Sequence, residues 1–243
     1  SSCTAGLHLS CLALDFKKGD EVIVPAMSHT ATAHAVEYTG AKVVFSDVDS
    51  LTGNISLNEI IRKTTPKTKG IIVVHMTGTP CDISKIAKFC KKKKIKLIED
   101  CAHALGTTYK KKHAGNFGET GCFSFYPTKQ ITTGEGGVVI TNKKNIYLKI
   151  KKLKAFGIDK DLKERKKAGL YDVKSLGFNY RMTDFQAAMG YFQLKRYKKN
   201  LSKRKKIANY YSKCLIKEKK IKFPKFSKDN SYFIFQILCE NRD

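Results

Sequence analysis

Short apolar runs alternate with helical stretches along this chain, and that alternation restricts its fold more than any other feature. Runs with the character of strands occur at residues 21–24, 43–45, 70–74, 95–98 and 138–141. Stretches with the character of helices occur at residues 31–39, 84–92 and 183–197. Strands separated by helices are typical of right-handed βαβ units. The sequence therefore predicts an α/β fold with a mainly parallel sheet flanked by helices.

The chain has 243 residues, enough for one large α/β domain and part of a second. Thr183 and Asp184 stand in capping position for the last helix, and the basic stretch at residues 195–220 predicts a helix leading into a smaller domain. Residues 231–238 have the pattern of a strand. We expect residues 1–195 to form the large domain without its N-terminal part. Residues 196–243 should hold the connecting helix and the beginning of a smaller α+β C-terminal domain.

A carboxylate follows one of the strand-like runs. Residues 96–98 read as the end of a buried parallel strand, so Asp100 is expected at its carboxyl end, where α/β sheets bind ligands. A carboxylate there can keep a cofactor ring nitrogen protonated, and removing one partner of such a buried pair costs about 3–5 kcal/mol. The alternative is that Asp100 only caps a helix beginning near Ala102, an ordinary role for aspartate.

One lysine differs in context from the rest of the 47 Lys and Arg residues. Lys129 follows the apolar run at residues 121–126 and precedes the glycine-containing segment 132–137, which can supply tight turns with positive φ. A lysine held against such walls loses solvation, so its pKa falls and its amine becomes a competent nucleophile.

Asp100 and Lys129 together predict a cofactor. An acid for a pyridinium nitrogen and an amine for an aldehyde carbon are what pyridoxal 5′-phosphate requires of a protein. The pair therefore predicts a pyridoxal-phosphate enzyme.

Eight blocks of sequence occur in the order seen in one family. They are residues 2–6 (SCTAG), 19–25 (GDEVIVP), 47–49 (DVD), 52–54 (TGN), 99–103 (EDCAH), 121–125 (GCFSF), 129–137 (KQITTGEGG) and 177–184 (GFNYRMTD). With these blocks the chain resembles, over nearly its whole length, the DegT/DnrJ/EryC1/StrS family of pyridoxal-phosphate-dependent sugar aminotransferases. The resemblance implies the large domain of the aspartate aminotransferase-like fold.

The resemblance implies roles around the cofactor ring. Lys129 matches the family's Schiff-base lysine, and Asp100 matches the acid beside the pyridine nitrogen. His103 stands where many members carry Gln and others His, on the side of the 3′-oxygen. His29 falls where the family often stacks a larger aromatic residue on the ring.

The resemblance also implies residues that bind the phosphate of the cofactor. Thr4, Ala5 and Ser124 match phosphate-binding positions, the first two through a loop that opens a helix, where free N–H groups and the helix dipole favour an anion. Asn179 matches a residue that reaches the phosphate of the neighbouring subunit. Arg181 is a candidate substrate-binding residue because its planar guanidinium suits a phosphate or a carboxylate. The alternative for Arg181 is a surface arginine beside a helix start.

The activity implied is transfer of an amino group, with L-glutamate as the usual donor, to a keto group of a nucleotide-linked deoxy sugar, for surface polysaccharide (lipopolysaccharide) or other glycan biosynthesis. The resemblance also implies a homodimer with shared active sites. Relatives with His in place of the lysine remove a sugar oxygen instead, and Lys129 favours transamination. A sugar dehydratase and a non-catalytic relative remain alternatives, and the sequence does not identify the sugar, the nucleotide or the aminated carbon.

The net charge of +26 supports a rival interpretation, a basic nucleic-acid-binding module. However, the lysines are dispersed over most expected helices, and no nucleic-acid motif occurs. The run of lysines at residues 91–94 is more typical of a solvated helix end. We therefore expect no nucleic-acid partner.

The eight cysteines form no C-x-x-C pair and have no metal-ligand spacing, so reduced thiols and no metal site are expected. No stretch approaches the ~20 apolar residues of a membrane span. These observations fit a cytoplasmic enzyme. Because family members are longer at both ends, we expect these residues to be an internal part of a longer protein. We also expect them, in isolation, to be poorly soluble or poor in cofactor.

Overall fold

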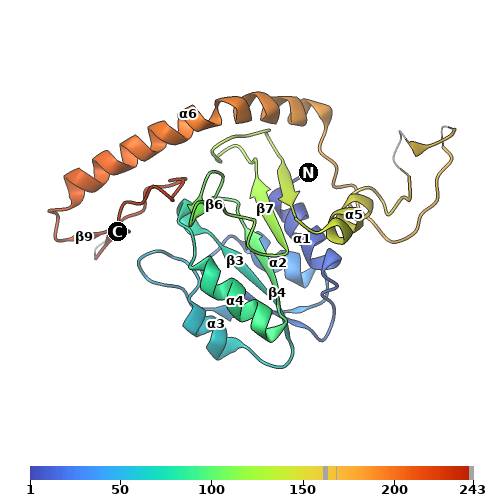
Figure 1. The fold of residues 1–243 in the computed structure, drawn as a ribbon, viewed down its shortest axis with the longest axis horizontal. Helices are drawn as coiled ribbons and strands as arrows, with labels where there is room; N and C mark the ends of the chain where they lie inside the picture. The colour runs from blue at the N-terminus through green and yellow to red at the C-terminus, as the bar shows by residue number, and fades with distance from the viewer. Residues whose placement is uncertain (161–163, 168, 241–243) are drawn as a thin grey trace.

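A six-stranded sheet forms the centre of the computed structural model, which describes residues 1–160, 164–167 and 169–240. The strand order is β2-β1-β3-β4-β7-β8, and every neighbouring pair is parallel except β7 with β8. These strands are β1 (Glu21–Pro25), β2 (Lys42–Ser46), β3 (Thr68–Val74), β4 (Lys96–Asp100), β7 (Thr120–Ser124) and β8 (Gly137–Ile140). The predicted α/β fold with a mainly parallel sheet is confirmed (Figure 1).

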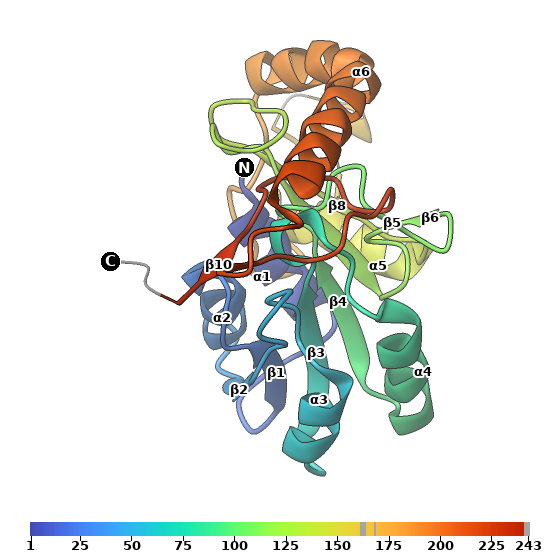
Figure 2. The same cartoon turned by 90° about the vertical axis from the view of Figure 1, so that its left-hand side faces the viewer.

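Helices cover both faces of the sheet (Figure 2). They are α1 (Cys3–Ala13), α2 (Thr30–Glu37), α3 (Leu57–Lys63), α4 (Ile83–Lys93) and α5 (Lys144–Leu153), with the 3-10 turn η1 (Met76–Gly78). Residues that alternate along a strand point to opposite faces. On β3, Ile72 packs with α1 and α2, whereas Ile71 and Val73 pack with α3 and α4. The central strands β1, β3, β4 and β7 are therefore buried on both sides, as their continuous apolar runs require.

A single helix, α6 (Asp184–Leu215), runs along the top of the molecule in Figure 1. Its N-terminus has a capping box, in which the Thr183 hydroxyl accepts the Gln186 N–H while the Gln186 side chain accepts the Thr183 N–H. The helix is continuous through residues 195 and 196, where the two expected domains meet.

The prediction of a strand at residues 231–238 is wrong for most of these residues. Only β10 (Leu238–Cys239) is a strand, paired with β9 (Ile221–Lys222). Upstream, the Ser231 N–H donates to the Gly78 carbonyl (3.2 Å) and the Phe233 N–H donates to the Thr77 carbonyl (3.0 Å). The backbone at residues 231–233 is therefore bound to the turn η1 and not to a neighbouring strand. A short hairpin, β5 (Thr108–Tyr109) and β6 (Lys112–His113), completes the strands in the described part of the chain.

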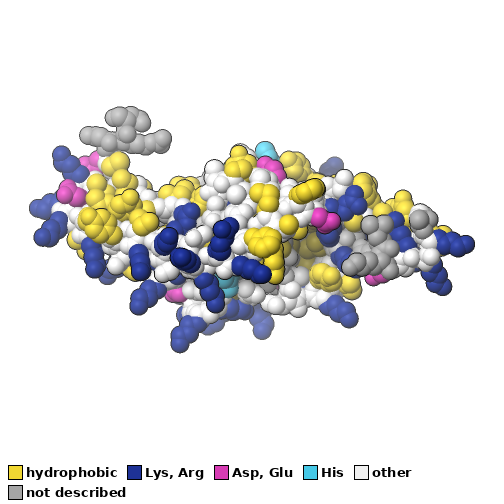
Figure 3. Space-filling model, turned by 90° about the horizontal axis from the view of Figure 1, so that it is seen from above, with side chains coloured by type: hydrophobic (Ala, Val, Ile, Leu, Met, Phe, Trp, Pro, Cys, Tyr) yellow, Lys and Arg dark blue, Asp and Glu magenta, His cyan; other side chains and the backbone are white. Residues whose placement is uncertain are grey.

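Charged side chains are spread over the surface. Lys and Arg side chains are distributed along the whole face seen from above, with hydrophobic side chains between them (Figure 3). Within the residues that the structure describes, no helix is both long enough and apolar enough to span a bilayer.

Candidate functional site

A cavity of about 620 Å³ lies at the carboxyl ends of β4 and β7, between the N-termini of α1 and α2. Six side chains singled out by the sequence line it: Thr4, His29, Asp100, His103, Ser124 and Lys129. They come from segments more than 120 positions apart, and the parallel sheet brings them together because the carboxyl ends of its strands share one edge.

Asp100 is the last residue of β4 and is 4% exposed. Its Oδ1 accepts the Ala102 N–H (3.0 Å), and its Oδ2 accepts the hydroxyl proton of Thr32 (2.8 Å). Burial raises the pKa of the Asp100 carboxyl, although these two donors and the charge of Lys129 favour its ionised form. No helix begins at Ala102, where the chain forms a turn, so the interpretation of Asp100 as a helix cap is wrong.

Lys129 stands on the loop between β7 and β8. Two backbone hydrogen bonds close this loop, from Phe125 N–H to the Gly136 carbonyl and from Thr133 N–H to the Phe125 carbonyl (both 2.9 Å). Gly134 has the positive φ (76°) expected of the glycine-containing segment. Burial lowers the pKa of Lys129, whereas the charge of Asp100 raises it. The lysine is thus partly desolvated and lies within the electrostatic reach of the carboxylate.

His103 lines the same cavity and its Nδ1 has no hydrogen-bond partner among the described residues. Burial, together with the nearby Lys129 and His29, lowers the pKa of His103 to about 4, so the imidazole is neutral at pH 7. Its ring stacks on that of Phe233, with centroids 4.3 Å apart, and the Nζ of Lys129 lies 4.7 Å from the Phe233 centroid. A neutral ring whose Nδ1 has no partner among the described residues is therefore held near the lysine.

The N-terminus of α1 faces the cavity through Ser2, Cys3 and Thr4. Ser2 is the N-cap, and its hydroxyl accepts the Ala5 N–H (3.0 Å). Ala5 therefore lies in the first turn, but it does not line the cavity. A Cβ on Gly137 would lie 2.4 Å from the carbonyl carbon of Ser2, so only glycine lets β8 approach this helix start. The positive end of the α1 dipole favours an anion here.

Ser124 and His29 complete the wall. Ser124 ends β7, and its hydroxyl accepts the Tyr126 N–H (3.3 Å). His29 is the N-cap of α2, and its Nδ1 accepts the Ala31 N–H (3.1 Å), which fixes the ring while leaving it exposed to the cavity.

Asn179 and Arg181 lie outside this cavity. Both are exposed, and the Nε–H of Arg181 donates to the Asn179 Oδ1 (3.1 Å). The guanidinium also lies 5.4 Å from the centroid of Phe156. Within one chain, the structure does not bring these two residues to the other six.

Sequence reasoning missed two neighbours of the site, Thr32 and Phe233. Thr32 binds Asp100 but lies 68 positions away, in a helix whose threonines look alike in the sequence. Phe233 belongs to the segment expected to be a strand, and a lone aromatic residue carries no functional signal. The Thr32 position could have been found only by recognising that α2 starts at the edge where β4 ends.

A second polar cluster lies beneath the site. His75, Glu99 and Cys101 bring potential metal ligands within 4.8 Å of one another, and all three are buried. However, Glu99 accepts the amide protons of Gly115, Phe117 and Gly118 at 2.6–2.7 Å and contacts the Nε2 of His75 at 3.0 Å. The Nδ1 of His75 in turn accepts the Cys81 N–H (3.1 Å). Protein groups thus engage both carboxylate oxygens of Glu99 and both ring nitrogens of His75, the atoms by which these two residues would bind a metal.

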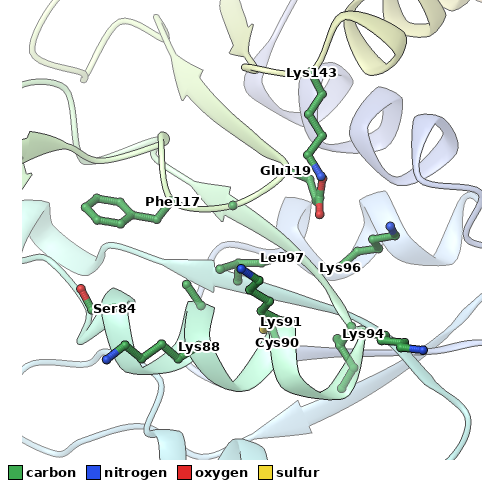
Figure 4. Close-up of a pocket in the computed structure, with 13 residues that line it drawn as sticks. Ser84, Lys88, Cys90, Lys91, Lys94, Lys96, Leu97, Phe117, Glu119 and Lys143 are labelled. Atoms are coloured by element: carbon green, nitrogen blue, oxygen red, sulfur yellow. The ribbon is translucent and has the colours of Figure 1, made fainter.

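Another hollow, of about 780 Å³, opens at the opposite edge of the sheet, between α4 and the start of β7 (Figure 4). Lys88, Lys91 and Lys143 are on its wall, around an apolar floor that includes Leu97 and Phe117. Glu119 forms an ion pair with Lys143. None of the residues predicted from the sequence lines this hollow, so the carboxyl-edge cavity is the candidate site.

Known proteins match both the sequence and the fold. The DegT/DnrJ/EryC1/StrS aminotransferase family matches residues 1–243. GDP-perosamine synthase of Escherichia coli O157:H7 is 40% identical over 245 residues, which cover 100% of this chain and 65% of that protein. An aminotransferase from Psychrobacter cryohalolentis has a TM-score of 0.91 at 33% identity, over 99% of this chain and 64% of its own. The protein ntda from Bacillus subtilis, solved with bound cofactor PMP, has a TM-score of 0.90 at 30% identity, over 99% of this chain and 54% of its own.

The chain thus spans less than two thirds of the length of each of these proteins. Within that span, the family match covers every residue and the folds superpose over nearly the whole chain. The chain belongs to the DegT/DnrJ/EryC1/StrS aminotransferase family.

Proposed function

We propose that this chain forms the cofactor-binding part of a pyridoxal-phosphate-dependent aminotransferase that transfers an amino group from L-glutamate to a keto group of a nucleotide-linked deoxy sugar. The observation that carries the proposal is the presence of Asp100 and Lys129 in one cavity beside the positive end of a helix. Family membership and a relative named for a GDP-linked sugar support it.

The cavity fits pyridoxal phosphate. The start of α1, with Thr4 and Ala5 in its first turn, and the hydroxyl of Ser124 would hold the phosphate. Asp100 would hold the protonated ring nitrogen, and the unpartnered Nδ1 of His103 would face the 3′-oxygen. His29 would cover one face of the ring. An anion site, a buried carboxylate and an amine thus line one cavity, as the charges of the cofactor require.

When bound, pyridoxal phosphate supplies an aldehyde carbon and an electron-withdrawing ring. Ionised Asp100 would keep a proton on the ring nitrogen and so maintain that withdrawal. Burial lowers the pKa of Lys129, which favours its neutral amine. As a general acid–base, this amine would take the proton from the α-carbon of the amino donor and deliver it to the C4′ carbon of the cofactor. His103 stays neutral at pH 7 because its pKa is about 4, so it adds no charge beside this amine.

The second subunit is part of the proposal. Large apolar side chains are exposed on α6 and on the segment before it, including Leu176 (83% exposed), Phe185 (87%) and Phe192 (62%). Exposed apolar surface of this kind indicates a protein interface. A homodimer would cover it and would let Asn179 reach the phosphate site of the partner, with Arg181 beside it for an anionic group of the substrate.

A nucleotide-linked amino sugar is an activated building block, so we place the product in glycan assembly, such as surface polysaccharide biosynthesis, and the enzyme in the cytoplasm. None of the eight cysteines, all within the described residues, forms a disulfide, which is consistent with a reducing compartment.

A single-turnover assay tests the proposed reaction. Purified protein loaded with pyridoxal phosphate is mixed with glutamate, and release of 2-oxoglutarate is measured before any sugar is added. One keto acid per site is expected, and none from Lys129→Ala, whereas Lys91→Ala on the α4 surface should behave as wild type. A protein that releases no keto acid but removes water from a keto sugar would be a dehydratase and would refute the proposal.

A further inference from the structure

Thr32, in the first turn of α2, is in direct contact with Asp100. It is 1% exposed, and its Oγ1 lies 2.8 Å from the Asp100 Oδ2. An ionised carboxylate can only accept hydrogen bonds, so the Thr32 hydroxyl must donate its single proton to Asp100.

Ser28 extends this contact by one step. Its Oγ lies 2.8 Å from the Thr32 Oγ1. Because the Thr32 proton is already engaged by Asp100, Ser28 must be the donor in this second hydrogen bond. The result is a directional relay from Ser28 to Thr32 to Asp100, and a chain of hydrogen bonds of one direction strengthens its members.

Among the described residues, no side chain near Asp100 could replace the hydrogen bond from Thr32 at normal hydrogen-bond distance. The Ala102 N–H holds the other oxygen, and apart from the Cys3 thiol at a long 4.0 Å, Thr32 is the only side-chain hydrogen-bond donor to Asp100 within the described residues. The titratable groups near the carboxylate are Lys129, His75 and the thiols of Cys3, Cys101 and Cys122. Burial raises the pKa of each of these thiols, so they remain protonated and add no negative charge beside the carboxylate.

The same turn of α2 carries His29, whose ring is held at the N-cap. The hydrogen bond from Thr32 to Asp100 therefore connects the helix turn that carries His29, expected on the face of the cofactor ring, to Asp100, expected at the ring nitrogen. If Thr32 only filled space in the core, its methyl group would suffice, and removing its hydroxyl would not change the properties of Asp100.

We propose that Thr32 is a positioning residue of the cofactor site: oriented by Ser28, its hydroxyl fixes the Asp100 carboxylate and locks the start of α2, with His29, to the end of β4. The role of Thr32 in binding pyridoxal phosphate rests on the proposed function, whereas the effect of its hydroxyl on the Asp100 carboxylate does not.

The test is the proton affinity of Asp100 in the cofactor-free protein, followed by carbon NMR of labelled aspartate and assigned with Asp100→Asn. Thr32→Val has nearly the same shape but no hydroxyl, and it should raise that affinity about ten- to hundredfold. Thr32→Ser should restore it to near the wild-type value. Ser28→Ala leaves Thr32 in place and should give a smaller rise, and Thr30→Val, at an exposed position of the same helix, should give none.

An unchanged affinity in Thr32→Val, or a Thr32→Ser variant that resembles Thr32→Val, would overturn the proposal. If Thr32→Val does not fold, Ser28→Ala decides, because an affinity equal to wild type there would exclude the relay. With cofactor added, Thr32→Val should bind pyridoxal phosphate but release keto acid from glutamate at least tenfold more slowly than Thr32→Ser. If even the wild-type protein binds no pyridoxal phosphate, the proposed function fails, while the NMR comparison still decides the relay.

Discussion

Glu99→Gln removes the charge at the centre of the buried network under the site. Each carboxylate oxygen of Glu99 has two donors: Oε1 accepts the N–H groups of Phe117 (2.6 Å) and Gly118 (2.7 Å), and Oε2 accepts that of Gly115 (2.7 Å) and contacts His75 (3.0 Å). Glutamine has one oxygen and one NH2 group, so in either orientation the NH2 group faces two donors.

Two hydrogen bonds to a charged acceptor are therefore lost, at about 1.5–3 kcal/mol each. The sum, about 3–6 kcal/mol, agrees with the ~3–5 kcal/mol expected for breaking a buried pair. A typical domain is stable by only about 5–15 kcal/mol, so the variant should be severely destabilised. The free energy of unfolding is measured by urea denaturation at pH 7, with the exposed Glu218→Gln as the control, expected within about 0.5 kcal/mol of wild type.

The pH dependence gives a second check. Burial alone would raise the pKa of Glu99, but the hydrogen bonds from His75 and the backbone outweigh it, so the pKa in the folded protein is lowered. The stabilisation is present above the unfolded pKa and is lost as pH falls through the folded value. The difference between wild type and Glu99→Gln should therefore shrink on acidification. A loss below about 1 kcal/mol at pH 7 would show that the hydrogen bonds to Glu99 contribute little to stability. A difference independent of pH would show that the ionised carboxylate is not their acceptor.

Two further variants probe the site itself. Asp100→Asn should keep the cofactor but slow keto acid release from glutamate at least a hundredfold, since about 3–5 kcal/mol of ring-nitrogen contact is lost, and an unchanged single-turnover rate would argue against the assigned role. Because burial raises the folded pKa of Asp100, its ionisation destabilises the cofactor-free protein as pH rises above the unfolded pKa, so Asp100→Asn should melt higher than wild type at pH 7 but not at pH 3. Gly137→Ala places a Cβ 2.4 Å from the Ser2 carbonyl carbon, and it should lower stability by about 1–3 kcal/mol and weaken pyridoxal phosphate binding. Equal cofactor affinity by fluorescence titration would show that α1 tolerates the shift.

The sequence predicted the sheet and most of the cavity because both depend on local signals. Asp100 and Ser124 end apolar strands, and the carboxyl ends of parallel strands meet at one edge whatever the detailed packing. The glycine at position 134 allowed the turn beside Lys129 to be foreseen. These features require no knowledge of distant contacts.

Contacts between residues far apart in the sequence could not be predicted from local patterns. The apolar alternation of residues 231–238 resembles a strand, but the backbone N–H groups of Ser231 and Phe233 bind the turn η1, which periodicity cannot show. The hydroxyl of Thr32 becomes significant only when the start of α2 is placed next to β4. Asn179 lies outside the cavity of its own chain, so its expected role depends on a second subunit that the sequence of one chain does not locate.

The most direct test of the central claim is to identify the residue that binds the cofactor. Purified protein is saturated with pyridoxal phosphate, reduced with borohydride to make the attachment permanent, digested and analysed by mass spectrometry. We expect a visible absorbance band before reduction and a modified peptide that contains Lys129, with both lost in Lys129→Ala. A label on a different lysine, or equal labelling in Lys129→Ala, would contradict it.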